Sequence, residues 1–463
     1  MLTARLSIMM FLEFFIWGAY FVSMVIYLNA ETAPLIQSEA MTVDEATSIT
    51  ANAYSAIPLG AVIAPLFLGL LADRLLPAQV VLGLLHLIGG GLLIALPSVP
   101  LTQFVPLLIA YAVCYMPTLG LTNTVAFKAI SDAKGDAEKA FPVVRVFGTI
   151  GWIVAGLTIS GFKLDADAEQ FRIAGYASIL LGLYSFTLPS TPPAMKGKPV
   201  SVGSLLGADA LVMLKDRSFT VFLVASMLLC IPLAFYYQQI GAYITAAAPV
   251  VAEFPVDAEA AADPDNGEAY LEAYDKELAD RTILKRATAI ATLGQVSEIG
   301  FMLLIPFFFR RLGTKWMLLV GMIAWAVRYV LFGVAFEGGI GWMVLLGIAL
   351  HGICYDFFFV TGQIYVDNAA PPEIRGQAQG LLVLLTQGIG MIVGAQLTGV
   401  FANWAGLQTA TEDWQTFWAY PAVIAAIIAV AFALLFKEPP RAAASIEDES
   451  LAEAGVPVTE PSL

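Results

Sequence analysis

The sequence predicts an all-α integral membrane protein of twelve transmembrane helices, arranged as two halves of six. Of its 463 residues, 59% are hydrophobic and only 13% are charged, whereas soluble chains carry roughly 25% charged residues. Long apolar runs recur along the chain, and each is close to the ~20 residues that span the hydrocarbon core of a membrane. A polar stretch divides these runs into two equal sets.

Each apolar run is expected to be a helix, because backbone groups cannot stay unpaired in lipid and no ten-residue alternating pattern indicates a barrel. The first run is too long for the apolar region of a signal peptide and contains Glu13, so we expect it to be retained. The expected spans are 6–28, 49–72, 77–97, 103–127, 141–161, 171–189, 218–246, 286–309, 315–336, 339–366, 376–403 and 416–436.

The distribution of basic residues predicts the orientation. Most of the 23 Lys and Arg residues fall in the loops on the side that also holds both termini, and such loops are usually cytoplasmic. A loop on the opposite, periplasmic side is acidic and is expected to be a solvated cap. The predicted division is an N-terminal half 1–190, a linker 191–217, a C-terminal half 218–440 with the acidic loop 247–283, and an acidic cytoplasmic tail 441–463.

Several classes of function are disfavoured. The net charge of −14 comes largely from the acidic loop and tail, and no basic stripe indicates nucleic acid as a partner. No phosphate loop indicates ATP as an energy source, and no metal-ligand spacing or nucleophile–base pair indicates a cofactor or an enzyme. The cysteines Cys114, Cys230 and Cys354 are expected to pack as small apolar residues. Paired six-helix halves favour a transporter, expected to be monomeric, with its site between the halves.

Ionisable residues inside spans carry most of the functional signal, because each costs at least roughly 2.5 kcal/mol at the bilayer centre. Gln295 and Glu298 are three residues apart in the eighth span and therefore share a helix face. A carboxyl group at that depth suits binding and release of a proton during transport. The alternative is a hydrogen bond that locks two helices together, and the shared face favours function.

The fifth span carries Arg145, Thr149 and Trp152, whose spacing of four and then three residues also places them on one face. The Arg and Thr side chains can hydrogen-bond a polar ligand, and the indole can stack on a flat ring. Alternatively, Arg145 lies near the cytoplasmic end and extends its charged group out of the bilayer.

The seventh span combines aromatic and amide side chains at Tyr237, Gln238 and Gln239, which is the chemistry that a heterocycle needs. Consecutive residues point in different directions, so only some of them can face a cavity. At least one tyrosine of this segment is expected to be an ordinary packing residue.

The tenth span places His351 and Tyr355 on one face, with Asp356 turned by one residue. Two interpretations of Asp356 remain open. Its carboxyl titrates in the cavity, or it forms a permanent structural ion pair with Arg328 of the ninth span. In the first span, Glu13 is either a further proton carrier or a hydrogen-bonding partner of a neighbouring helix. In the third span, His86 is expected to be a packing residue.

The two-half plan resembles the major facilitator superfamily, and GLLADR at 69–74 resembles its conformational gating motif, represented by Gly69, Asp73 and Arg74. From about residue 6 to 437, the chain is similar to the bacterial nucleoside:proton symporter family. The stretches that carry this resemblance are YMPTLGLTNT at 115–124, RVFGTIGW at 145–152, SMLL at 226–229, QVSE at 295–298, IPFF at 305–308, AWAVR at 324–328, DFF at 356–358 and IRGQAQG at 374–380.

This resemblance implies proton-coupled nucleoside import by alternating access across the bacterial inner membrane, with the proton as coupling ion and no other cofactor. By residue, it implies substrate binding by Arg145, Thr149, Gln295, Glu298 and Asp356, with Trp152 and Tyr355 at aromatic positions. The proton-coupling candidates are Glu298, Asp356 and Glu13.

Four positions depart from the family pattern. Ala234 and Tyr237 stand roughly where Gln and Asn are expected, His351 replaces a tyrosine, and Glu13 stands where a neutral amide is familiar. The same fold could carry a sugar or oligosaccharide instead, and a membrane receptor that senses a ligand without moving it is the third hypothesis.

Overall fold

The helices predicted from the apolar runs account for the regular structure of the protein. The computed structural model describes residues 2–67, 71–72, 75–133, 137–193, 208–261, 263, 266–371, 374–409 and 412–437, and every regular element within them is helical. The gating-motif residues Gly69, Asp73 and Arg74 lie outside the described residues, as does the predicted tail 441–463.

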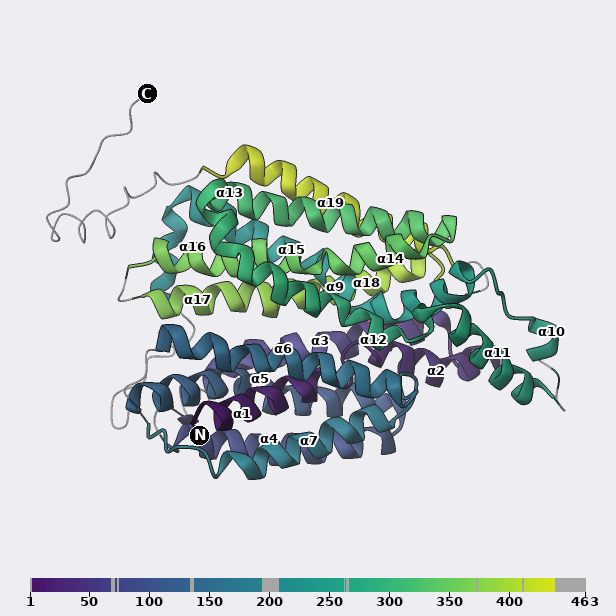
Figure 1. Ribbon diagram of the computed structural model, residues 1–463, viewed down its shortest axis with the longest axis horizontal. Coiled ribbons are helices and arrows are strands. Elements are labelled where there is room, and N and C mark those ends of the chain that lie inside the picture. Colours follow the sequence, from purple (N-terminus) through teal and green to yellow (C-terminus); the bar gives the residue numbers. More distant parts are fainter. Residues whose placement is uncertain are drawn as a thin grey trace, which may run out of the picture.

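The first half of the chain forms one layer, drawn in purple to blue in Figure 1. In this layer α1 packs on α6, α3 on α5, and α4 on α7. Its elements are α1 (Leu2–Gly18), α2 (Met24–Gln37), α3 (Val43–Phe67), α4 (Ala78–Ala95), the 3₁₀ helix η2 (Leu96–Ser98), α5 (Leu101–Asp132), α6 (Ala137–Gly161) and α7 (Glu169–Ser185).

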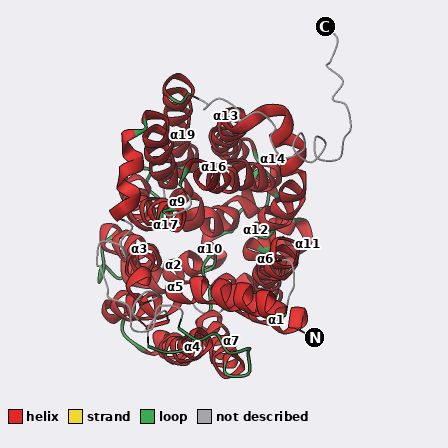
Figure 2. Cartoon of the chain, turned by 90° about the vertical axis from the view of Figure 1, so that its left-hand side faces the viewer, coloured by secondary structure: helices red, strands yellow, loops and turns green. Residues whose placement is uncertain are grey.

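The second half forms the other layer, in which α13 packs on α19 while α9 packs on α18 and α19. Figure 2 looks along the helices and shows the two groups one above the other. The elements are η3 (Ala208–Lys215), α9 (Arg217–Val251), α10 (Ala258–Ala261), α11 (Gly267–Arg281), η4 (Ile283–Lys285), α12 (Ala287–Ala291), α13 (Leu293–Gly338), α14 (Gly341–Ala349), α15 (His351–Tyr355), the π-helix η5 (Asp356–Val360), α16 (Thr361–Ala369), α17 (Arg375–Val383), the π-helix η6 (Leu384–Gly390), α18 (Met391–Trp404) and α19 (Trp414–Leu435).

Within the described residues, eight helical segments are long and apolar enough to cross a membrane, which makes this a multi-pass membrane protein. The longest segment, Ala287–Gly338, contains two predicted spans. They meet at Gly313, where φ of 74° and ψ of 176° break the helix. The predicted span 6–28 also differs from the structure, because turns at 19–23 separate α1 from α2.

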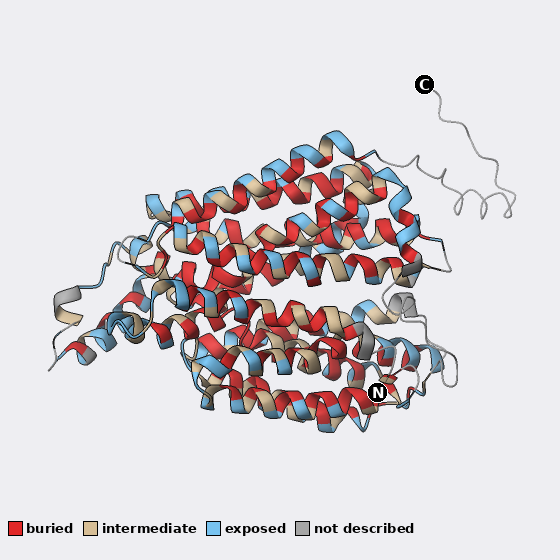
Figure 3. Cartoon of the chain, turned by 180° about the vertical axis from the view of Figure 1, so that it is seen from behind, coloured by how far each residue is buried: buried red, intermediate tan, exposed pale blue. Residues whose placement is uncertain are grey.

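The two layers are joined toward one end of the molecule. We call this the loop end, because it carries α10 and α11 of the predicted loop 247–283, at the right of Figure 1. Buried faces of both layers turn inward in Figure 3, and the outer helix faces are exposed. Hydrogen bonds between the halves run from the Thr288 N–H to Asp165 (3.1 Å), from the Ala289 N–H to Ser160 (3.0 Å), and from the Gln396 amide to Asn52 (3.0 Å) and Ser55 (2.8 Å).

Glycines let helices of the first layer approach closely. A Cβ atom added at Gly151 of α6 would lie 2.2 Å from the Phe11 carbonyl oxygen of α1, and one at Gly60 of α3 would lie 2.4 Å from the Ala112 carbonyl oxygen of α5. Small residues at such contacts favour close backbone packing in membranes. The positions of α1 and α6 therefore depend on the absence of a side chain at Gly151.

Substitution of Gly151 is expected to destabilise the protein. The added methyl group of Gly151→Ala must displace the α1 backbone, and overpacking of this kind costs about 1–3 kcal/mol. The measurement is the melting temperature of the purified protein in detergent. The matched control is Gly161→Ala in the same helix, where an added Cβ meets no atom within 4 Å. Equal melting temperatures for the two variants would contradict this account.

Candidate functional site

A small polar cavity of about 100 Å³ lies between the two layers. We call it the central cavity. Its walls come from α1 and α6 of the first half and from α9, α13, α15, η6 and α18 of the second half. The residues that line it are Phe14, Trp17, Phe21, Arg145, Thr149, Trp152, Leu233, Tyr237, Gln295, Glu298, Tyr355, Gln387 and Met391.

The α6 wall carries the three residues that the helical spacing places on one face. Arg145, Thr149 and Trp152 all line the central cavity, and the side chains of Thr149 and Trp152 are mostly buried. The Arg145 guanidinium lies over the ring of Phe14, 4.1 Å from its centroid. This cation–π contact holds the charge inside the molecule. It favours the interpretation of Arg145 as a cavity residue over one in which its charge leaves the bilayer.

Aromatic rings of the first predicted span complete this wall, and the sequence analysis missed them. The Trp17 ring meets Trp152 edge to face with centroids 5.5 Å apart, and the Phe21 ring meets Tyr237 of the opposite half at 5.6 Å. Phe14, Trp17 and Phe21 follow a spacing of three and then four residues. That spacing is an aromatic stripe on one helix face, which could have identified them.

The second half of the chain contributes a carboxyl group and amide groups to the central cavity. Gln295, Glu298, Tyr237 and Tyr355 line the cavity as predicted, and Gln387 joins them. Gln387 lies within the π-helix η6, a backbone form that is frequent at functional sites. As an amide within the apolar segment 381–395, it too had a signal in the sequence.

Four of the predicted substrate-binding residues do not line the central cavity. Gln238 is buried, and both polar atoms of its amide lack a hydrogen-bond partner. Gln239 lines a separate cavity at the loop end. His351 and Asp356 are fully buried at 0% exposure. Two of them, Gln238 and Asp356, directly follow a cavity residue in sequence, and the helical turn between neighbours points their side chains elsewhere.

His351 connects the cavity to a buried arginine. The Arg328 Nη1 lies 3.3 Å from His351 Nδ1, and because arginine can only donate, Nδ1 is the acceptor. The ring proton of His351 therefore sits on Nε2, which lies 4.0 Å from the Glu298 Oε2. Arg328 thus fixes the imidazole tautomer that presents an N–H toward Glu298.

Arg328 does not form the ion pair with Asp356 that was one of the two interpretations of that residue. Both side chains are described, and no salt bridge joins them. Instead, the Arg328 Nε donates to the Gly347 carbonyl oxygen at 3.2 Å, and the guanidinium lies 3.7 Å from the centroid of the Tyr236 ring. Tyr236 is the packing tyrosine that the seventh span was expected to contain. Neither carboxyl oxygen of Asp356 has a hydrogen-bond partner, and a buried charge without a partner is costly.

Glu13 lies in a closed polar network inside the first half. Its Oε2 is 2.9 Å from His86 Nε2, and its Oε1 accepts a hydrogen bond of 2.6 Å from the Thr118 hydroxyl. The Ser178 hydroxyl donates to the His86 carbonyl oxygen at 2.9 Å and lies 3.0 Å from His86 Nδ1. Because its only hydrogen is used, Ser178 accepts from a protonated Nδ1.

The network leaves a single proton between Glu13 and His86. Whether that proton resides on the carboxyl or on the imidazole, the pair is neutral overall, and every polar atom at the contact is satisfied. Both side chains are buried, with 0% and 1% exposure. This geometry corresponds to the helix–helix hydrogen-bond interpretation of Glu13, with His86 as its partner rather than a simple packing residue.

Sequence comparison connects this arrangement to known proteins. A family model described as nucleoside H+ symporter matches residues 1–441. The chain belongs to the nucleoside proton symporter family. The putative nucleoside transporter YegT of Escherichia coli is 37% identical over 94% of each chain, and the E. coli nucleoside permease NupG is 32% identical over 94% of this chain and 96% of its own.

Solved structures agree with this assignment. The crystal structure of the nucleoside transporter NupG matches 95% of this chain and 100% of its own with a TM-score of 0.76 at 28% identity, and that of a NupG mutant matches with a TM-score of 0.79. A D-xylose–proton symporter matches with a TM-score of 0.64 at 13% identity, which shows the fold alone. The family therefore has the major facilitator fold, and its members are transporters rather than enzymes, as the sequence predicts. Among the described residues, no three His, Cys, Asp or Glu side chains gather as metal ligands.

The hydrogen-bond network around Glu13 predicts different effects for two substitutions in this symporter. Glu13→Gln keeps an acceptor for Thr118 and a donor for His86 Nε2, so the melting temperature in detergent should stay near that of the parent. Glu13→Leu leaves His86 Nε2 unsatisfied, although Thr118 can still donate to the Tyr115 carbonyl oxygen, and a buried unsatisfied group costs about 1–3 kcal/mol. A Glu13→Leu protein that is as stable as Glu13→Gln would show that the network contributes nothing to stability.

Proposed function

We propose that this protein imports nucleosides together with protons by alternating access. The observation that carries the proposal is the composition of the central cavity. Aromatic rings from the first half face an amide–acid pair from the second half. A nucleoside presents a flat ring system and polar edges, and these two walls match those two features. The family assignment supports the same cargo.

The proposed architecture has twelve spans with both termini in the cytoplasm of a bacterial cell, in the inner membrane. The break of α13 at Gly313 supports the count, because it separates two of the predicted spans. The basic loops support the orientation, which places the loop end in the periplasm. We further propose the division into halves 1–190 and 218–440, joined by the linker 191–217, and a monomer as the transporting unit.

Residues from both walls are proposed to hold the base and ribose. Trp152 and Tyr237 would pack against the base, and Arg145 and Thr149 would hydrogen-bond the ribose hydroxyls. Gln295, Glu298 and Gln387 supply amide and carboxyl groups for the remaining polar edges. Tyr355 completes the second-half wall, behind which His351 holds its N–H toward Glu298.

Alternating access requires the halves to separate at one end and close at the other. The hydrogen bonds between the halves lie toward the loop end, so this conformation is closed to the periplasm. Pockets for small ligands measure about 300–1,000 Å³, whereas the central cavity measures about 100 Å³. We infer that the cavity widens when substrate enters, and that the π-helices η5 and η6 on its second-half side accommodate the movement.

Glu298 is the proposed proton carrier, because it is the carboxyl group that lines the cavity. Asp356 is the second candidate, since its buried, unpartnered carboxyl is favourable only when it is neutral. Glu13 is the third, and its pairing with His86 argues for a structural role instead. The proton is the only coupling partner in this proposal.

Removal of the Glu298 carboxyl is expected to uncouple transport. Glu298→Gln keeps the hydrogen-bonding shape but cannot bind and release a proton, so nucleoside should no longer accumulate above equilibrium, while exchange across the membrane persists. The measurement is uptake and exchange of labelled nucleoside in proteoliposomes. The matched control is Glu13→Gln, the same substitution in the closed network, which should retain accumulation. Unchanged accumulation by Glu298→Gln would transfer the coupling role to Asp356.

Uptake of labelled uridine and adenosine into proteoliposomes tests the function itself. With an inward proton gradient, uptake should exceed the equilibrium level, and a protonophore should abolish the excess. Unlabelled nucleosides should compete with the label, whereas sugars should not. Absence of nucleoside entry under both conditions would overturn the proposal, and competition by sugars would favour the sugar-transporter alternative.

A further inference from the structure

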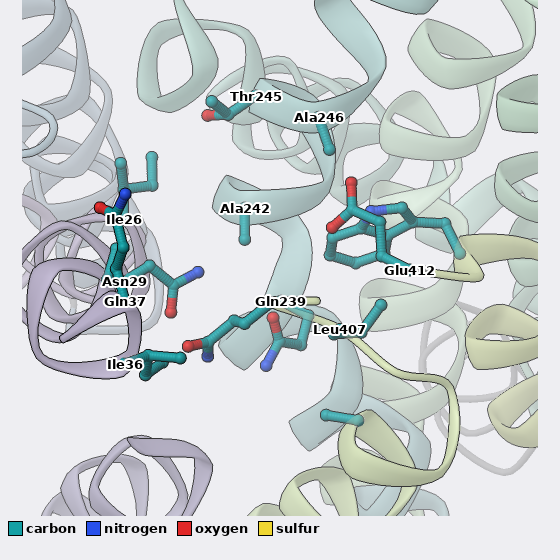
Figure 4. A pocket seen from close by; sticks show the side chains of 14 residues that line it. Ile26, Asn29, Ile36, Gln37, Gln239, Ala242, Thr245, Ala246, Leu407 and Glu412 are labelled. Carbon is teal, nitrogen blue, oxygen red and sulfur yellow. The ribbon is translucent and has the colours of Figure 1, made fainter. Parts of the chain in front are cut away.

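A second, larger cavity lies between the halves at the loop end. It measures about 550 Å³, within the range of small-ligand pockets. We call it the outer vestibule. Its walls come from α2 of the first half and from α9, the end of α18, the following loop and the start of α19 in the second half. Figure 4 shows α2 residues on one side and Gln239 and Glu412 facing them.

Residues close together in α9 line the vestibule and the central cavity. Tyr237 lines the central cavity and Gln239, two residues further along α9, lines the vestibule. Next to the vestibule, α9 approaches the turns that precede α2 closely, because a Cβ added at Gly241 would lie 2.5 Å from the Val22 carbonyl oxygen. The vestibule therefore lies just outside the contacts that close the central cavity at this end.

The polar groups of the vestibule are amides, one carboxyl group and the hydroxyl of Thr245, which already donates to the Gly241 carbonyl oxygen. Asn29 and Gln37 come from α2, while Gln239, Gln408 and Glu412 come from the second half. Gln239 is only 4% exposed, and the Asn29 Oδ1 is buried without a hydrogen-bond partner. Such groups are normally satisfied in folded proteins. The position of the Asn29 oxygen at this cavity indicates that a ligand or water completes its hydrogen bonding.

The chemistry of the lining selects a class of ligand. No Lys or Arg is among the described residues that line the vestibule, so it offers no charge complement to a phosphate or carboxylate group. The amides both donate and accept, and Glu412 accepts. A buried tryptophan, Trp414, adds an aromatic ring beside Glu412. This set suits an uncharged molecule with several hydroxyl and ring-edge groups.

We propose that the outer vestibule is a second nucleoside-binding site, occupied when the loop end is closed. The ligand class rests on the proposed function. Because the walls belong to both halves, a nucleoside bound there stabilises the closed arrangement. External nucleoside at high concentration therefore slows its own import, since the site that it fills opposes separation of the halves at the loop end.

Equilibrium binding of labelled uridine and of labelled adenosine to the full-length purified protein tests this proposal. The parent protein should bind two molecules per chain of at least one of these nucleosides. Gln37→Ala and Glu412→Gln, both at the vestibule, should weaken one of the two sites at least tenfold and leave the other. Arg145→Ala, in the central cavity, should weaken the other site. Glu31→Gln, the same kind of substitution on the exposed face of α2, should leave both sites unchanged.

The outcomes separate this proposal from the proposed function. One bound molecule per chain, lost in Arg145→Ala and kept in Glu412→Gln, would overturn the vestibule site alone. Absence of binding by either nucleoside would overturn both. Uptake gives an independent readout, because the initial rate of the parent protein should fall at high external nucleoside, and the rate of Glu412→Gln should reach a plateau. A plateau in the parent protein would contradict self-inhibition from the vestibule.

Discussion

A polar or charged side chain inside a membrane must find its partner within the protein. Each ionisable residue of these spans meets that constraint differently. Glu13 shares a proton with His86 and accepts from Thr118. Arg328 is surrounded by aromatic rings and donates to a backbone carbonyl. Glu298 opens onto the central cavity. The groups with complete partnerships hold the helices together, and those with incomplete ones remain available for transport.

Helical spacing predicted two of the cavity walls well, but it failed for His351, which is four residues from Tyr355 and does not line the cavity. Arg145, Thr149 and Trp152 share one face of α6, and Gln295 and Glu298 share one face of α13, as expected. The spacing cannot decide which of two adjacent residues faces a cavity, because that depends on how neighbouring helices pack. Tyr237 therefore faces the central cavity, while Gln238 is buried away from it and Gln239 faces the vestibule.

The fold followed from the apolar runs, but two details required the structure. The turns at 19–23 separate α1 from α2, although the sequence there is as apolar as a continuous span. The π-helices η5 and η6 carry no sequence signal, since their extra residue per turn is determined by tertiary packing. The partner of Arg328 was also inaccessible to sequence reasoning, because Asp356 and His351 lie within one helical run and either could face the ninth span.

The hydrogen bond from Arg328 to His351 has an electrical consequence. While Arg328 donates to Nδ1, that nitrogen has no free lone pair for a proton, so the imidazole is uncharged in this conformation. In the proposed symport, each proton that enters with a neutral nucleoside brings one net positive charge into the cell. Each such charge gains about 2.3 kcal/mol per 100 mV of membrane potential. The resting voltage of a cell, and not only its pH gradient, would therefore concentrate the cargo.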